Sequence, residues 1–267
     1  MTRVEKELSR LRIDASLNDF AVRCFRDIAD QDYIAARMAW RHSLYPQFHW
    51  SALQAIEKYL KCILLLNRVP AKNLRHDLDK ALQLTSKLPF DIELSASSRE
   101  LIQHLDRFGR WRYLESSYYV YGPKLVQLDR TVWEVRRYCQ RLDVEIELPD
   151  GRTKNLLGVK LAAIHLEQGA DKRRLKLSGG LLEKIVANRE HPARAPLIWK
   201  NLFYGLSKRS QVQMKTTFHA TNAPLTLHPE ILDEVLKYVF LPKEVVKAYR
   251  EEVRGGSGDG STPPDDG

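Results

Sequence analysis

The fold of this chain is decided by residues 32–82, DYIAARMAWRHSLYPQFHWSALQAIEKYLKCILLLNRVPAKNLRHDLDKAL. Apolar residues recur at intervals of three and four over residues 32–44, which is typical of one stripe of an amphipathic helix. A second, wider apolar face extends over residues 48–67. The stretch therefore predicts two long antiparallel helices that pack through their apolar sides. The second face consists of Phe48, Ala52, Ala55, Ile56, Tyr59, Leu60, Ile63 and Leu64.

Helical periodicity also dominates the sequence around this pair. Asp77 is placed to cap a third helix, and Ser97 and Ser98 to cap a fourth over residues 99–108. A further helix is predicted for residues 123–142. Beyond it, apolar and acidic residues alternate over residues 144–148 before Pro149, Asp150 and Gly151, which predicts a short hairpin. Helices then resume at residues 156–168 and 179–188, and after Pro229 and Pro242.

These elements predict a mainly α protein. We expect an antiparallel helical bundle in residues 1–142, followed by a smaller, mostly helical carboxyl-terminal region with a short hairpin in residues 143–254. The final stretch, residues 255–267, contains only Gly, Ser, Thr, Pro and Asp, and we expect it to be a disordered tail.

The composition favours anionic partners to a limited degree. The 267 residues carry 43 Lys plus Arg against 34 Asp plus Glu, a formal net charge of +9, and Arg supplies 25 of the cations. Guanidinium groups bind two phosphate oxygens at once, so nucleic acid is one interpretation. A solvated basic surface explains the same excess.

The cysteine and histidine pattern is not that of a disulfide-bonded or metal-binding protein. Cys24, Cys62 and Cys139 lie far apart, so we expect buried thiols in a reducing compartment. The eight His residues are dispersed, and we expect no metal site and no cofactor. The charged amino terminus has no apolar run of the signal-peptide type, and no segment approaches the roughly 20 apolar residues that a bilayer requires. A cytoplasmic protein without membrane contact is expected.

The segment QAIEKYLKCILLL (54–66), followed after a loop by His76-Asp77-Leu78, resembles the HEPN family of helical domains. The resemblance covers about residues 17–142 and implies an antiparallel helical bundle. HEPN proteins include metal-independent ribonucleases, toxins of toxin–antitoxin pairs and modules that lie beside nucleotidyltransferases. The resemblance therefore implies RNA or a nucleotide as ligand, a homodimer, and a nucleotidyltransferase as a conceivable protein partner.

In the ribonuclease branch, the signature is an arginine followed four to six residues later by a histidine. Arg99 with His104 and Arg37 with His42 have this spacing here, and Arg99 is preferred because it lies near a predicted helix start. The resemblance implies that His104 would transfer a proton while Arg99 stabilises charge on the phosphorus. Five residues turn a side chain roughly 140° around a helix, so the two would converge only across a bend or a dimer interface.

An aromatic and basic segment, GRWRYLESSYYVY (109–121), is the second candidate site. Arg110 and Arg112 alternate with Trp111 and Tyr113, and three further tyrosines follow. Aromatic rings stack on unpaired bases and arginines bind phosphates, so the segment predicts contact with single-stranded RNA. The alternative is that its aromatic residues pack into the bundle.

Two function classes follow from these observations. The leading hypothesis is a HEPN protein that binds or cleaves RNA, in a toxin or defence setting. The alternative is a non-catalytic module that binds a protein partner or a nucleotide. Two basic clusters, Arg136-Arg137 with Arg141 and residues 172–176, are compatible with phosphate contacts or with a solvated surface.

Overall fold

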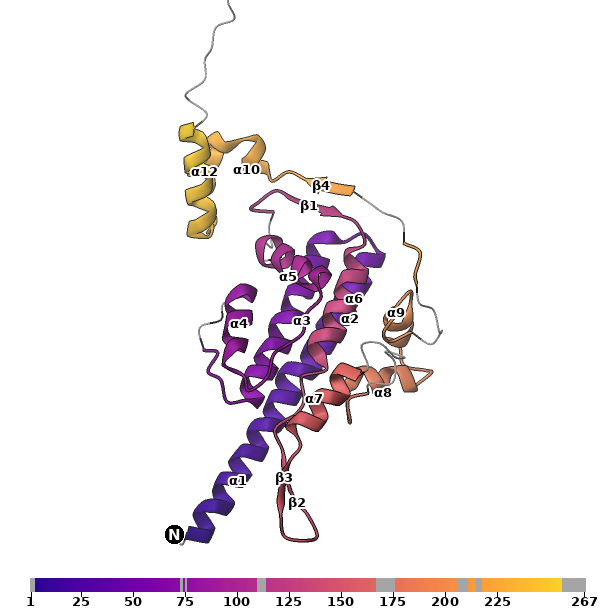
Figure 1. Cartoon of the computed structure of the whole chain (residues 1–267). Helices are drawn as coiled ribbons and strands as arrows, with labels where there is room; N and C mark the ends of the chain where they lie inside the picture. The colour runs from indigo at the N-terminus through magenta and orange to yellow at the C-terminus, as the bar shows by residue number, and fades with distance from the viewer. Residues whose placement is uncertain are drawn as a thin grey trace, which may run out of the picture. The chain divides into compact units, whose positions relative to one another are not determined.

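The structure is a computed structural model that describes residues 3–72, 74, 76–109, 114–166, 176–205, 211–214 and 218–255. It is mostly helical, as predicted (Figure 1). The chain forms two compact units: unit 1 comprises Met1–Arg110 with Pro123–Lys215, and unit 2 comprises Trp111–Gly122 with Thr216–Gly267. This division differs from the boundary at residue 142 that the sequence suggested.

Unit 1 contains a bundle whose helices come mainly from the first half of the chain. Its long amino-terminal helix is continuous, because a π-helical segment joins α1 to α2 without a break. In order, the elements are α1 (Arg3–Phe20), η1 (Ala21–Arg26), α2 (Asp27–Arg41), α3 (Tyr45–Leu66), α4 (Leu78–Leu84), η2 (Thr85–Lys87), α5 (Ala96–Phe108) and α6 (Lys124–Arg136).

The pairing of α2 with α3 is the centre of this bundle, as the sequence predicted. Three residues join the two helices, which lie side by side in Figure 1. Tyr33 and Ala36 of α2 are fully buried, as are Phe48, Ile56 and Leu60 of α3. Burial of side chains such as Phe48, Ile56 and Leu60 stabilises a fold by about 1.5–3 kcal/mol each, so the seam between the two helices contributes strongly to the core. The prediction that the cysteines are buried holds for Cys62 and Cys139 but is wrong for Cys24, which is exposed.

The helix caps agree with the sequence at one position and differ at another. Asp77 caps α4, and its Oδ1 accepts a hydrogen bond of 2.8 Å from the backbone N–H of Lys80. Helix α5, however, begins three residues earlier than predicted, because Ser95 rather than Ser97 or Ser98 is its cap. The Ser95 hydroxyl accepts from the Ser98 N–H, and Arg99 therefore lies just beyond the first turn.

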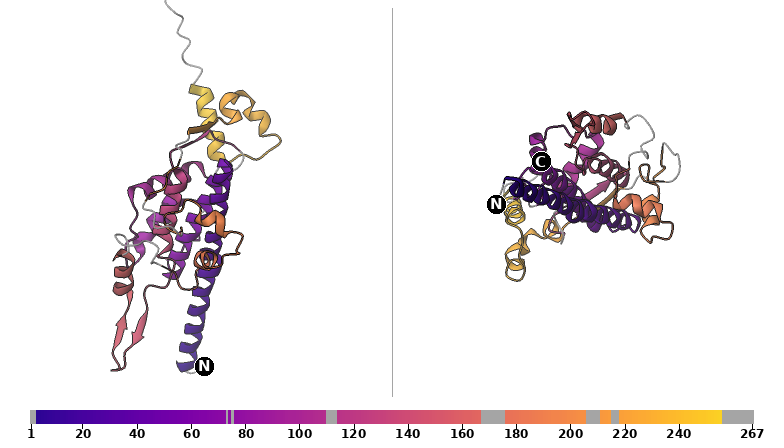
Figure 2. Two further views of the ribbon diagram at one scale, coloured as in Figure 1. Left: turned by 90° about the vertical axis from the view of Figure 1, so that its right-hand side faces the viewer. Right: turned by 90° about the horizontal axis from the view of Figure 1, so that it is seen from below.

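The predicted hairpin is present in unit 1. It consists of β2 (Glu145–Glu147) and β3 (Thr153–Asn155), which pair antiparallel with Ile146 opposite Lys154. The hairpin and α1 project from the same end of the bundle (Figures 1 and 2). The remaining helices of unit 1 are α7 (Leu157–Leu166), α8 (Leu181–Ala187) and α9 (Arg194–Ile198).

Buried arginines explain why residues 143–205 belong to the same unit as the bundle. Arg136 of α6 donates to Glu183 of α8 at 2.7 Å, and Arg137 donates to the carbonyl of Ile164 at 3.1 Å. The bundle helices accept from only some of the donors of these guanidinium groups, and the later segments supply further acceptors.

Unit 2 is a small assembly of one β-ribbon and short helices. Strand β1 (Tyr118–Tyr121) pairs antiparallel with β4 (Phe218–Thr221), although the sequence of residues 109–123 is only partly periodic and by itself indicates a helix end and a loop. A strand of four residues gives too short an alternation to be distinguished from a loop. The other elements are α10 (Pro224–Leu227), η4 (Pro229–Ile231), α11 (Leu232–Val235) and α12 (Lys243–Gly255), where helices were predicted after Pro229 and Pro242.

The core of unit 2 forms around Leu225, Leu232, Val245 and Tyr249. The Tyr249 hydroxyl also donates to the Glu115 carbonyl at 3.0 Å, which attaches α12 to the segment before β1. In the part of the chain that the structure describes, no helix is both long enough and apolar enough to cross a membrane.

Candidate functional sites

The predicted catalytic pair is split between two environments. Arg99 lies on the exposed side of α5, whereas His104 is buried on the opposite side. The ring of His104 packs against Phe108, and its Nε2 lies 3.0 Å from the Nε2 of His49 of α3. Within one chain, therefore, α5 directs the two side chains apart, as its helical geometry requires.

Burial keeps both histidines of this contact in the neutral form. Desolvation, helped by the charges of His104 and Lys124, lowers the pKa of His49 to about 3. Desolvation and the charge of Lys124 lower the pKa of His104 to about 4. Near pH 7, one neutral ring can donate its Nε2 proton to the other, which suits a packed helix contact.

The other pair with the ribonuclease spacing is also separated. His42 is exposed at the end of α2, but Arg37 is fully buried. The guanidinium of Arg37 donates to Asp129 and to the backbone carbonyls of Pro196 and Trp199. Its donors are thus used to attach α9 to the bundle.

Arg136 and Arg137 belong to the interior, which neither the phosphate interpretation nor the solvated-surface interpretation anticipated. Arg136 donates to Asp30 at 2.7 Å and to Glu183, and Asp30 also accepts from the Tyr59 hydroxyl at 2.6 Å. Burial would lower the pKa of Arg136, but the carboxylate of Asp30 raises it well above its usual value. Of the three arginines in this cluster, Arg141 alone is exposed. In the second cluster, Lys176 is exposed and residues 172–174 lie outside the described residues.

The predicted RNA-binding residues Arg110, Trp111, Arg112 and Tyr113 lie outside the described residues. The chain is described again from Leu114, and β1 begins four residues later.

The β-ribbon of unit 2 has an exposed aromatic face. Tyr121 lies opposite Phe218, and Tyr119 lies opposite Ala220. Opposed residues and residues two apart on one strand share a face of an antiparallel pair, so all four side chains are on the same side. Tyr119, Tyr121 and Phe218 are 46%, 59% and 71% exposed, respectively. The alternative that these aromatic residues pack into the bundle is therefore not what the structure shows for Tyr119 and Tyr121.

A polar network on α3 joins residues 54–61 to His76, which follows in the next loop. The Glu57 carboxylate accepts from Lys61 Nζ at 2.6 Å and lies 2.8 Å from His76 Nδ1. Burial alone would raise the pKa of Glu57, but these hydrogen bonds and charges outweigh it and lower the pKa. Lys58 donates to Gln54 and to Asp32, so the polar residues of α3 fix neighbouring segments. The sequence signal was the His76-Asp77-Leu78 motif, whose aspartate is explained by capping alone.

Comparison with known proteins gives no match: no family model, no curated protein and no solved structure matches this chain. Among the described residues, no group of three or more His, Cys, Asp or Glu side chains could hold a metal ion.

Proposed function

We propose that this protein binds single-stranded RNA through the aromatic face of unit 2, defined by Tyr119, Tyr121 and Phe218. The observation that carries the proposal is the exposure of three aromatic side chains on one face of a β-ribbon. Small proteins rarely leave several large rings in water on one side of an element without a binding role.

The chemistry of the face fits unpaired bases. Every base has a π-face, so neighbouring rings can stack on successive bases with little dependence on sequence. Arg110 and Arg112 stand shortly before β1 in the sequence, and the chain carries a formal net charge of +9. Phosphate contacts by such cations release counterions and make binding weaken steeply with salt.

We infer that unit 1 is a HEPN-like bundle, and we propose that the protein is a homodimer in a toxin or defence setting. The support is the resemblance of residues 54–66 and of the His76-Asp77-Leu78 motif, together with the mainly helical structure and the α2–α3 pair. A nucleotidyltransferase partner remains part of the same proposal.

Cleavage of RNA by Arg99 and His104 has weaker support than binding. A histidine whose pKa is about 4 is a poor proton acceptor near pH 7, and it is buried beside His49. Scission at this pair therefore requires a rearrangement of α5 or a second copy of the chain. His104→Ala tests it directly: RNA incubated in chelator with each purified protein is cut equally if His104 takes no part.

The binding proposal is tested by fluorescence anisotropy with labelled single-stranded RNA of mixed sequence. We expect binding that weakens with salt, and a weaker response with an RNA duplex of equal length, because paired bases cannot stack on the face. The double variant Tyr121→Ala with Phe218→Ala should lower the affinity at least about tenfold, since each stacked base contributes about 1–3 kcal/mol.

Tyr238→Ala is the matched control. Tyr238, at 78% exposed, is an even more exposed aromatic residue of unit 2, but it lies between α11 and α12 rather than on the ribbon. We expect this variant to bind RNA as the wild type does. If RNA does not bind at low salt, the protein-partner alternative is favoured; if all variants bind equally, the aromatic face is not the site.

A further inference from the structure

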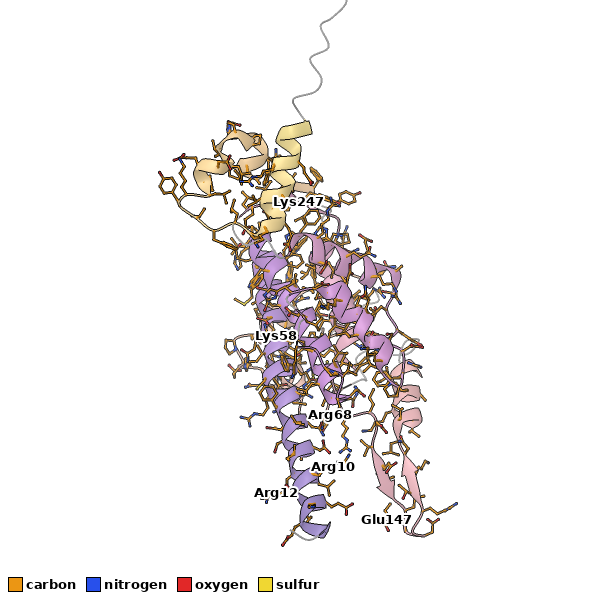
Figure 3. The ribbon with its side chains drawn as sticks, turned by 90° about the vertical axis from the view of Figure 1, so that its left-hand side faces the viewer. Arg10, Arg12, Lys58, Arg68, Glu147 and Lys247 are labelled. Carbon is orange, nitrogen blue, oxygen red and sulfur yellow. The ribbon has the colours of Figure 1, made fainter. Side chains whose placement is uncertain are left out.

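Unit 1 contains a cavity of about 490 Å³ that the RNA proposal does not use. It lies between the junction of α1 with η1, the end of α3 and the loop that follows α3. Arg68, in that loop, lies at the end of the bundle from which α1 projects (Figure 3). The volume is within the range of about 300–1,000 Å³ that is typical of sites for small molecules.

The walls of the cavity are mostly apolar. Phe20 and Phe25 meet edge to face with ring centroids 5.8 Å apart, and Leu65 and the loop residues 69–71 complete the lining. Phe20 is 50% exposed. The cavity thus offers water an apolar surface that a ligand could cover.

The polar residues that line the cavity are all cations. They are Lys61, Arg68 and Lys72, and none of the described lining residues is acidic. Lys61 already donates to Glu57, which lies outside the lining. Lys72 is exposed and has no ion pair with another described residue, so its ammonium group can meet an anion at the rim.

The loop that closes the cavity is held in place before any ligand binds. Arg68 has a φ of 58°, in the left-handed region that a residue with a Cβ rarely adopts. Its guanidinium donates to the Asp14 carboxylate at 3.1 Å and to the Asp14 carbonyl at 3.1 Å, which attaches the loop to α1. A preformed site loses less free energy to ordering when a ligand binds.

We propose that this cavity binds a small amphipathic anion, a molecule with an apolar body and one terminal carboxylate or phosphate. The apolar body would contact Phe20, Phe25 and Leu65, and the anionic group would face Lys72 at the rim, because the guanidinium of Arg68 is already paired with Asp14. The cavity accommodates one small molecule rather than a nucleic-acid strand. The proposal is therefore independent of RNA binding by unit 2.

The probe is 1-anilinonaphthalene-8-sulfonate, an aromatic anion whose fluorescence rises in apolar sites, titrated into the full-length protein. Decanoate and AMP are then added as competitors. Displacement by decanoate indicates an acyl carboxylate as the ligand, and displacement by AMP indicates an aromatic phosphate. Unit 2 also has a cavity with apolar surface, lined in part by Leu236 and Leu241, and the probe can bind there as well. Only the probe fluorescence that is lost in variants of unit 1 is therefore assigned to the cavity of unit 1.

Two variants locate the site. Ala71→Trp fills the cavity, and Lys72→Ala removes the exposed cation at its rim; we expect at least tenfold weaker probe binding for the first and severalfold weaker binding for the second. Lys80→Ala removes an exposed lysine of α4 that does not line the cavity and should leave binding unchanged.

The result that would overturn the proposal is unchanged probe binding in a folded Ala71→Trp protein. If that variant does not fold, Lys72→Ala decides, because a surface lysine can be removed without disturbing the core. Equal binding by Lys72→Ala and the wild type at low salt would then show that the rim does not recognise the anion. Probe binding to unit 1 is measured separately from RNA binding. Loss of RNA binding in the Tyr121→Ala, Phe218→Ala protein therefore does not affect this test.

Discussion

The two units both depart from the usual rule of burial, in opposite directions: unit 1 buries charged and polar side chains, and unit 2 exposes aromatic ones. In unit 1, the buried side chains include arginines and histidines: Arg37, Arg136 and Arg137 each donate to acceptors on distant segments, and His49 packs against His104. In unit 2, tyrosine and phenylalanine side chains are left in water on the β-ribbon.

This contrast shows why residue type alone misplaces a site. An arginine carries five hydrogen-bond donors. The backbone groups within a helix are hydrogen-bonded to one another, so side chains of this kind provide the donors that attach additional segments to the bundle. An antiparallel ribbon can pack through one face and leave the other in solvent: Val120 is buried, whereas Tyr119, Tyr121 and Phe218 are exposed. The arginines that resemble a phosphate site form buried hydrogen bonds in unit 1, and the aromatic residues that resemble a core are exposed in unit 2.

Arg136→Ala is expected to have the largest effect on the stability of the protein. The substitution leaves the Asp30 carboxylate buried without its cation, and we expect the free energy of unfolding of the chain to fall by about 3–5 kcal/mol. Urea denaturation followed by circular dichroism measures it.

Arg141→Ala is the control, because this neighbouring arginine is exposed and donates only to the Asp143 carbonyl among the described residues. Its effect should stay within about 0.5 kcal/mol. Equal losses in the two variants would mean that the buried ion pair is not what distinguishes Arg136.

The His49–His104 contact predicts a loss of stability in mild acid. Both pKa values lie below the ordinary value of 6.5, at about 3 and about 4, so the unfolded chain binds protons first as the pH falls. The free energy of unfolding should therefore decrease from about pH 6.5 towards pH 4. For His104, the shift from 6.5 to about 4 corresponds to roughly 3 kcal/mol.

A double variant isolates this contribution. In His49→Leu with His104→Leu, no imidazole is left at this contact, and the unfolding free energy should change less between pH 7 and pH 4 than in the wild type. Urea denaturation at several pH values gives the two curves. Parallel curves would show that the histidines keep ordinary pKa values in the folded protein.

Much of the fold could be predicted from the sequence, because long amphipathic helices repeat their signal many times. The α2–α3 pair and the β2–β3 hairpin each follow from periodicity and turn residues. The exact start of α5 could not, since Ser95, Ser97 and Ser98 are equally good caps by type. Strand β1 was missed because its partner β4 is about a hundred residues away, and pairing of that kind leaves no local trace.

The candidate sites were less predictable than the fold. The aromatic segment before residue 121 was identified, but not Phe218, which joins the face only through strand pairing. The pairing of His104 with His49 also depends on the packing of α5 against α3. Their spacing along one helix predicts that the side chains of Arg99 and His104 point in different directions. It does not predict which residues each side chain contacts.

A smaller effect on unit 1 is expected from Asp77→Ala. Its carboxylate is the cap of α4, and loss of a cap of this kind costs about 1 kcal/mol. Asp77→Asn keeps an oxygen that can accept from the Lys80 N–H and should retain most of that stability. If the two variants are equally unstable in urea denaturation, the charge of Asp77 rather than its hydrogen bond is the contribution.

A substitution on the aromatic face is expected to change stability least, and it tests the difference between the two units most directly. Phe218 is 71% exposed, so Phe218→Ala removes little buried surface and should alter the free energy of unfolding by less than about 0.5 kcal/mol. The same substitution lies on the face that we propose stacks on bases, and it should weaken RNA binding. Phe218 is thus expected to contribute to RNA binding and little to stability, whereas Arg136 is expected to contribute most to stability. A large loss of stability in Phe218→Ala would show instead that the ring packs against part of the folded protein, and the face would then no longer be available to RNA.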